Sequence, residues 1–93
     1  MVDMGHFFFD PEDKIYLEHF PGNPVVPGTL IIKAFMDLID ESNLMIENFT
    51  YKKFLRPGRC SYSMEKKDNT YNCKIYDGKK TVAKGFIKTG ESL

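Results

Sequence analysis

The spacing of hydrophobic and polar positions along the chain predicts its elements. Phe7-Phe8-Phe9 precedes Asp10-Pro11-Glu12-Asp13, which predicts a short strand followed by a turn. The alternation over residues 14–18 predicts a second extended stretch. From Gly28 to about Ser42 the apolar residues recur with a helical period, and this is the only helix that the pattern indicates.

The two faces of this predicted helix differ strongly in width. Its polar side chains fall within a stripe about 100° wide, formed by Lys33, Asp37, Asp40 and Glu41. Its apolar side chains fill an arc of about 200°, formed by Ile31, Ile32, Ala34, Phe35, Met36, Leu38 and Ile39. The acidic residues lie late in the helix, which its dipole disfavours, so tertiary packing must hold it. An apolar arc this wide requires a surface that curls around the helix.

The remainder of the chain predicts that surface. It contains β-rich stretches with the apolar or aromatic positions Phe49, Tyr51, Tyr62, Met64, Tyr71, Cys73, Ile75, Val82 and Phe86. Turn signals separate these stretches at residues 56–58, 67–69 and 77–78. Consecutive hairpins would make the resulting strands, about four after the helix, antiparallel. We therefore expect an α+β fold, in which one central helix is wrapped by a curved antiparallel sheet, as a single domain over residues 1–93.

Composition narrows the classes of protein. With 42% hydrophobic and 28% charged residues the chain is typical of globular proteins. No apolar run approaches the roughly 20 residues of a membrane span, and no export signal is evident at the amino end, so we expect a cytoplasmic protein.

Charge is distributed unevenly although the net charge is zero. Residues 1–50 carry nine acidic and two basic side chains, and residues 51–93 carry four acidic and eleven basic ones. The basic half suits docking of an acidic partner, or it decorates the solvent side of strands. No strongly basic domain or recognised motif favours nucleic acid.

The two cysteines do not suggest a disulfide or a metal site. A hairpin that turns near Asp68 would place Cys73 opposite Met64 and Cys60 near Asp77, so the thiols would not meet. Two cysteines with two distant histidines also make a poor zinc set. We expect both cysteines to be reduced and structural, and no zinc site.

The segment HFPGNPVVPGTL, residues 19–30, offers candidate chemistry. Pro24 and Pro27 stiffen the backbone, and Gly28 leaves room for a close approach. The segment ends where a helix begins, and the free N–H groups of a helix start stabilise negative charge. His19, with a reference pKa near 6.5, suits proton transfer at neutral pH. From these residues alone, a catalytic loop and a simple chain reversal both stay open.

The same segment resembles the signature of the 3-hydroxyacyl-acyl-carrier-protein dehydratases of fatty acid biosynthesis, which are hotdog-fold enzymes of lipid metabolism. The resemblance is dense from His19 to Phe35 and looser elsewhere. It implies that His19 is the catalytic base, that the Val25 carbonyl orients the imidazole and that the Gly28 N–H binds the thioester carbonyl. It further implies a homodimer, no cofactor, and removal of water from a 3-hydroxyacyl thioester to give a trans-2-enoyl thioester.

One position departs from the family pattern. The helix carboxylate of the family, contributed by the other subunit, falls fourteen residues after the histidine, where this chain has Lys33. Asp37 lies one turn later on the same face, and three interpretations of it stay open. It pairs with Lys33, it replaces the family's acid from a displaced position, or it is only part of the solvated face. The alternative function is therefore a catalytically silent module that binds acyl groups or carrier protein, or the inactive partner of an active hotdog subunit. A thioesterase, with Asp37 as its carboxylate, is a third reading.

Overall fold

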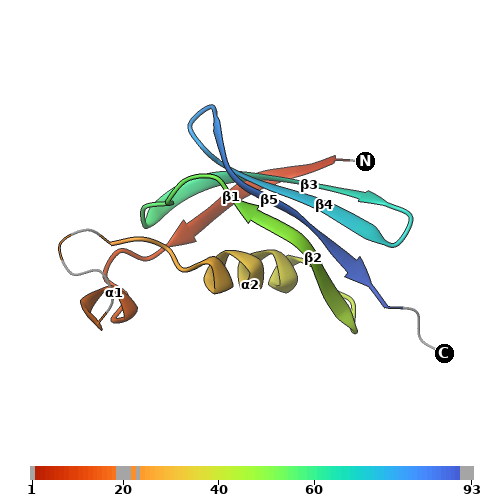
Figure 1. The fold of residues 1–93 in the computed structure, drawn as a ribbon, viewed down its shortest axis with the longest axis horizontal. Coiled ribbons are helices and arrows are strands. Elements are labelled where there is room, and N and C mark those ends of the chain that lie inside the picture. Colours follow the sequence, from red (N-terminus) through yellow and green to blue (C-terminus); the bar gives the residue numbers. More distant parts are fainter. Residues whose placement is uncertain (1, 19–21, 23, 91–93) are drawn as a thin grey trace.

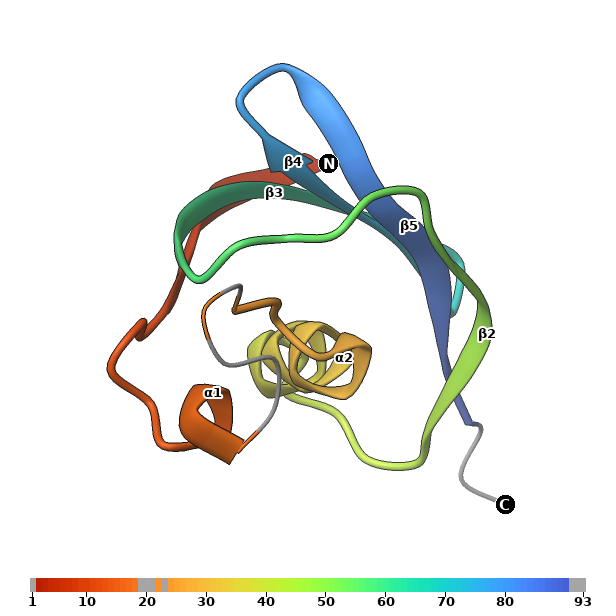
Figure 2. The same ribbon diagram turned by 60° about the vertical axis from the view of Figure 1, so that its left-hand side comes forward.

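The computed structural model describes residues 2–18, 22 and 24–90. Its elements are β1 (Val2–Phe9), α1 (Ile15–Glu18), α2 (Gly28–Leu38), β2 (Leu44–Tyr51), β3 (Gly58–Lys67), β4 (Thr70–Asp77) and β5 (Lys80–Thr89), shown in Figure 1. Within these ranges the strands form one five-stranded antiparallel sheet in the order β1-β3-β4-β5-β2. The sheet is curved, and α2 lies on its concave side (Figure 2). The predicted wrapped helix is confirmed.

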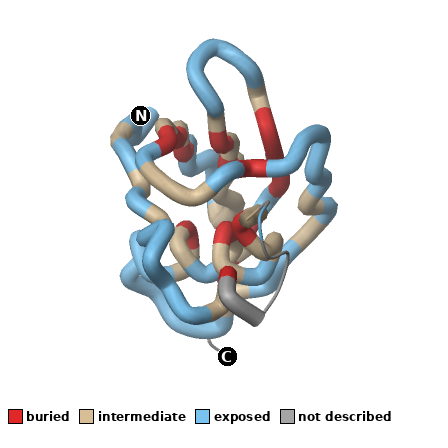
Figure 3. The backbone as a smooth tube through the Cα atoms, turned by 90° about the vertical axis from the view of Figure 1, so that its left-hand side faces the viewer, coloured by how far each residue is buried: buried red, intermediate tan, exposed pale blue. Residues whose placement is uncertain are grey.

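Aromatic side chains join the helix to the sheet. Phe35 of α2 is fully buried, and its ring lies edge-on to Phe7 of β1 at 5.1 Å between ring centroids. Phe7 in turn stacks on Tyr62 of β3 at 4.4 Å. Such aromatic pairs add about 0.5–1.5 kcal/mol beyond their area of burial. Most buried positions lie on α2 and the strands, with Tyr16, Val26, Ile39 and Leu55 as additions from α1 and the loops. The β4–β5 hairpin loop at the top of Figure 3 is exposed.

The prediction of an extended stretch over residues 14–18 is wrong, because a helical turn, α1, occupies residues 15–18. Its start is fixed by two aspartates. The Asp10 carboxylate accepts a hydrogen bond from the Glu12 N–H at 2.9 Å, and the Asp13 carboxylate accepts one from the Ile15 N–H at 3.1 Å. These local side-chain bonds favour a turn over a strand. The turn buries Tyr16.

The predicted helix is real but shorter than expected, since α2 ends at Leu38 rather than near Ser42. Ile39 adopts an extended conformation and remains buried. Asp40 and Glu41 therefore lie in the segment that follows the helix and not in its last turn.

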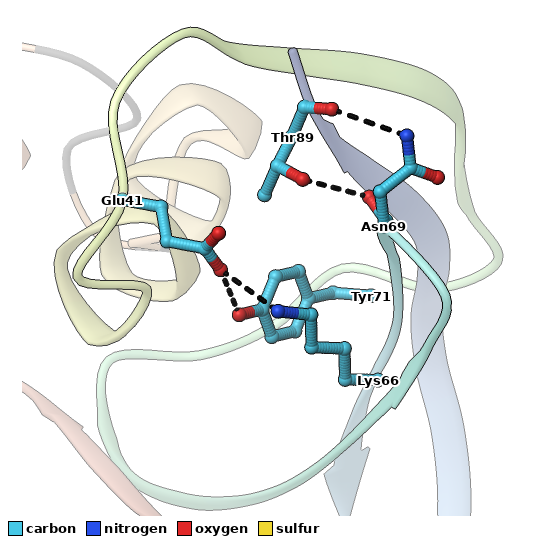
Figure 4. Close-up of polar contacts among 5 residues, drawn as sticks. All are labelled: Glu41, Lys66, Asn69, Tyr71 and Thr89. Atoms are coloured by element: carbon cyan, nitrogen blue, oxygen red, sulfur yellow. Dashed lines mark hydrogen bonds and ion pairs between the residues drawn. The ribbon is translucent and has the colours of Figure 1, made fainter. Parts of the chain in front are cut away.

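Glu41 instead joins the segment after α2 to the β3–β4 hairpin (Figure 4). Its carboxylate accepts hydrogen bonds from the Tyr71 hydroxyl and, at 3.3 Å, from the Lys66 ammonium. The Lys66 ammonium also lies 5.3 Å from the centre of the Tyr71 ring. Nearby, the Thr89 hydroxyl donates to the Asn69 carbonyl at 3.2 Å, which ties the hairpin loop to the end of β5.

The strand connections match the prediction only in part. The loops between β3 and β4 and between β4 and β5 are hairpins at residues 68–69 and 78–79. The second loop lies one residue later than the predicted Asp77-Gly78, with Gly78 at φ +63°. Consecutive pairing fails at β2, which pairs with β5 instead of β3. The six residues 52–57 carry the chain across the sheet end, so β2 forms one edge and β1 the other.

A β-bulge changes which face the end of β2 presents. The register shifts between Glu47 and Thr50, and Asn48 lies there at φ +51°. Before the bulge, Ile46 pairs with the buried Ile87; after it, Tyr51 pairs with the buried Ala83. Because side chains alternate along a strand, one inserted residue reverses the face. Phe49 and Tyr51 consequently point toward α2.

The predicted register, which keeps the two thiols apart, is confirmed. Met64 pairs with Cys73 as expected, and both Cys60 and Cys73 are free and buried. Burial raises the pKa of the Cys60 thiol to about 11 and that of Cys73 to about 12. Both thiols therefore stay protonated near neutral pH, and a protonated thiol is a poor nucleophile.

Candidate functional site

The stiff segment reaches α2 through a buried backbone contact. The Val26 N–H donates to the Leu55 carbonyl at 2.8 Å, and both side chains are buried. Pro27 is the N-cap of α2, and its carbonyl accepts hydrogen bonds from the Leu30 and Ile31 N–H groups at 3.0 and 3.3 Å. The loop before the helix is thus anchored to the segment that follows β2.

Among the described residues, the first amides of α2 have no hydrogen-bond acceptor. Proline at the N-cap has no side-chain hydrogen bond to offer, and within residues 24–90 no acceptor contacts the Gly28 or Thr29 N–H. Helix N-termini with such free N–H groups stabilise negative charge, including a carbonyl oxygen that becomes enolate-like. The prediction that Gly28 begins the helix is confirmed. Its role as a donor stays a prediction.

An apolar cavity of about 290 Å³ lies at the start of α2, with Gly28 but not Thr29 in its lining. It is lined by the backbone and side chains of Val25, Val26, Pro27, Gly28, Ile31, Tyr51, Lys53, Phe54 and Leu55. Phe54 is 83% exposed, so the mouth of the cavity carries a large aromatic side chain in contact with solvent. Two of the predicted site residues, Val25 and Gly28, are therefore brought together at one cavity.

Sequence reasoning missed four residues of this cavity. Tyr51 appeared only as a strand residue, and Lys53 only as one basic residue of many. Phe54 and Leu55 fall within the looser part of the resemblance. Tyr51 reaches the site because the bulge in β2 turns it toward α2. Asn48, which is neither a glycine nor in a recognised turn pair, gives no sequence signal for that bulge.

Lys33 and Asp37 lie together on the exposed face of α2. The Lys33 ammonium donates to the Asp37 carboxylate at 2.9 Å, and their side chains are 69% and 66% exposed. Of the possibilities for Asp37, the structure shows the pairing with Lys33. Neither residue lines the cavity of the same chain.

The remaining candidates lie elsewhere. His19 falls outside the described residues. His6 is exposed on β1 and pairs with Ser61 across the strand. Within residues 2–18, 22 and 24–90 no group of three or more His, Cys, Asp or Glu side chains is placed to hold a metal ion. In the same ranges no helix has the length and apolar character needed to cross a membrane.

Comparison with known proteins gives a consistent picture at the level of sequence. A family model described as ApeI-like, ApeI dehydratase, matches residues 4–85. The 3-hydroxyacyl-[acyl-carrier-protein] dehydratase FabZ of Campylobacter lari is 30% identical over 97 aligned residues, which cover 85% of this chain and 66% of that protein. FabZ of Campylobacter jejuni strain RM1221 is 25% identical over 108 residues, covering 97% of this chain and 74% of that protein. The chain thus spans slightly less than two thirds of the C. lari relative.

Solved structures agree on the fold. The dehydratase heterocomplex ApeI:P from Xenorhabdus doucetiae superposes with a TM-score of 0.78 at 23% identity, covering 94% of this chain and 85% of that one. A point mutant of the fluoroacetyl-CoA-specific thioesterase FlK superposes with a TM-score of 0.59 at 12% identity, and the superposition covers 94% of this chain and 82% of that one. These likenesses confirm the hotdog fold. Because the family model covers most of its length, this chain belongs to the ApeI-like dehydratase family.

Proposed function

We propose that this chain binds acyl thioesters at the start of α2 and serves as a subunit of a (3R)-hydroxyacyl thioester dehydratase. The observation that carries the proposal is the apolar cavity of about 290 Å³ lined by Gly28, whose N–H meets no acceptor among the described residues. An apolar wall suits an acyl chain, and the amides suit the thioester carbonyl at its end. Membership in a dehydratase family supports the reaction class.

In the proposed reaction the His19 imidazole takes a proton from C2 of the substrate. The C3–O bond then breaks, the hydroxyl leaves with a second proton as water, and a C2–C3 double bond forms. The Gly28 N–H holds the carbonyl oxygen while it carries negative charge. One such donor contributes about 10²–10³ in rate in other enzymes. The Val25 carbonyl orients the imidazole.

The second proton needs a donor. Because Lys33 stands where the family has a carboxylate, two candidates for that donor follow. In a homodimer the Lys33 ammonium would supply it. The ion pair with Asp37 favours a second candidate, because it leaves neither side chain as a free carboxylic acid. In that candidate a different hotdog chain supplies the carboxylate. The similarity to ApeI:P, a dehydratase that is itself a heterocomplex, supports an assembly of unlike chains.

We infer further that the acyl group arrives on an acidic carrier protein. Lys53 lines the cavity, and Lys52 and Arg56 are exposed close to it in sequence. Positive side chains at the mouth of a site attract an acidic partner and accelerate its association. The relatives named as acyl-carrier-protein dehydratases support this choice of partner.

The test is hydration of crotonyl-coenzyme A, which is the reverse of the proposed reaction. Hydration is monitored as a loss of the absorbance of the enoyl thioester. The parent protein should hydrate the probe, and His19→Ala should abolish the activity. His6→Ala, which removes the other histidine from the exposed face of β1, is the matched control and should retain it.

Lys33→Glu separates the two candidates. If the parent is active and Lys33→Glu is slower, Lys33 is the proton donor of a homodimer. An inert parent that gains activity with Lys33→Glu supports the two-chain candidate. If neither protein turns over or binds the probe, and neither binds acyl carrier protein, the proposed function is wrong.

A further inference from the structure

The phenol of Tyr51 contacts the first residue of α2. Its hydroxyl donates a hydrogen bond to the Gly28 carbonyl at 3.1 Å, across 23 positions of sequence. The ring lies so close that a Cβ atom on Gly28 would be 2.7 Å from Cζ and from the hydroxyl oxygen of Tyr51. Gly28 has no positive φ, so the close approach of Tyr51, rather than the backbone conformation, calls for glycine here.

This contact acts on the peptide group that also holds an open amide. The Gly28 carbonyl and the Thr29 N–H belong to one peptide unit, and a hydrogen bond to the carbonyl polarises that unit and makes its N–H a stronger donor. The bond also fixes the plane of the peptide. Since Pro27 provides no side-chain cap, Tyr51 is the side chain that holds the first turn of α2 within the described residues.

Several features keep Tyr51 in place as a donor. The β-bulge at Asn48 turns the end of β2 inward, and the Phe49 ring lies 6.0 Å from the Tyr51 ring. Burial raises the pKa of the Tyr51 phenol, so the hydroxyl keeps its proton at neutral pH. Tyr51 also lines the cavity itself, so its ring lies beside any acyl group bound there.

We propose that Tyr51 is a positioning residue for the dehydration: its hydrogen bond to the Gly28 carbonyl holds the first turn of α2 so that the Gly28 N–H faces the reacting carbonyl in the cavity. The inference rests on the proposed function. It adds a residue on a different element, which works through the helix backbone rather than through the substrate.

The experiment compares Tyr51→Phe, which keeps the ring and removes the hydroxyl, with Tyr76→Phe. Tyr76 is a matched control, because its hydroxyl lies 3.0 Å from that of Ser63 and outside the cavity. In crotonyl-coenzyme A hydration, Tyr51→Phe should lower kcat about three- to tenfold, the worth of one hydrogen bond, with KM changed less than about twofold. The Tm of the two variants should agree within a few degrees. An unchanged kcat, or a loss confined to KM, would overturn the proposal.

A second readout does not require turnover. Crotonyl-coenzyme A bound to the His19→Ala protein should show its thioester carbonyl stretch at lower frequency than in water, because the amides polarise it. Adding Tyr51→Phe should remove part of that shift while the probe stays bound. If the shift responds but the parent never hydrates the probe, the positioning role stands and the proposed turnover fails. If the frequency shift is the same with and without Tyr51→Phe, or if the probe does not bind at all, the positioning role is refuted.

Discussion

Gly85 of β5 is a glycine because of a single neighbour. A Cβ atom on it would overlap the Phe49 ring and would lie 2.7 Å from the Phe49 Cα. The second contact is with backbone, so rotation of the side chain would not relieve it. The bulge in β2 brings Phe49 this close, and the missing side chain of Gly85 is what accommodates it. The same pairing of a glycine with an aromatic ring recurs at Gly28 and Tyr51.

Gly85→Ala should therefore destabilise the fold by overpacking, by about 1–3 kcal/mol in the free energy of unfolding. Urea denaturation of the variant, with Lys84→Ala on the exposed face of the same strand as control, measures the cost. In a Phe49→Ala background the overlap with the ring is removed and only the contact with the Cα atom remains. The added methyl group should then cost less, so the two substitutions should couple in a double-mutant cycle. Purely additive effects would contradict this packing account.

At the scale of elements, the segment after α2 is held by charge and hydrogen bonding. Glu41 follows the helix and contacts Tyr71 and Lys66 of the β3–β4 hairpin (Figure 4). The hydrogen bond from Tyr71, followed by the contact with Lys66, holds the pKa of the Glu41 carboxyl below its usual value of 4.5. This contact fixes how the chain passes from the helix to the edge strand β2.

The lowered pKa predicts the pH dependence of this contact. The unfolded chain takes up a proton on Glu41 near its usual pKa, and the folded chain does so only at lower pH. The contact therefore stabilises the fold above about pH 4.5 and loses its effect as the pH falls through the folded pKa. Tyr71→Phe should lower the Tm at pH 6–7, and the difference from the parent should shrink toward pH 3.

The control for this pH series is Tyr76→Phe, whose hydroxyl contacts Ser63 and no carboxylate. Its difference in Tm from the parent should not depend on pH over the same range. If the difference in Tm between Tyr71→Phe and the parent stays constant from pH 3 to 7, the stabilisation by Tyr71 does not depend on the Glu41 carboxylate.

At the scale of the whole molecule, the two edges of the sheet differ. On β1 the inward residues Phe7 and Phe9 pack against the core, and the exposed apolar residues, Val2 among them, face outward. On β2 the inward-facing Ile46 is 43% exposed, although its partner Ile87 is fully buried. Leu38 of α2 is also exposed. An apolar side chain on the inner face that stays uncovered favours assembly through the β2 edge.

We therefore expect the protein to associate through β2, with itself or with a second hotdog chain. Ile46→Lys would bury a charge in that contact and should shift the protein toward monomer in analytical ultracentrifugation. Val2→Lys is the matched control, since Val2 is similarly exposed, at 50%, on the other edge strand. A parent that sediments as a monomer alone and with candidate partners, or Val2→Lys as disruptive as Ile46→Lys, would contradict this.

Much of the fold followed from local pattern. The helical period over residues 28–38, the turn signals near Asp68 and Gly78 and the width of the apolar arc together predicted a helix in a curved antiparallel sheet, and the register of Met64 with Cys73 followed from the hairpin. The dense segment at residues 19–30 indicated the dehydratase family. Local errors arose where short-range hydrogen bonds compete with alternation, as at Asp13 and α1, and where the helix stops before its acidic residues.

The sequence by itself determined what depends on neighbours in the chain: the helix and its start at Gly28, the hairpins, and the segment that marks the family. Only the tertiary structure decided that β2 lies beside β5, that a bulge turns Tyr51 onto the helix start, and that the cavity forms between this helix start and the segment after β2. These features depend on residues that lie far apart in sequence or on the inserted residue of a bulge. A one-residue insertion reverses every side chain after it, and no local propensity encodes that shift.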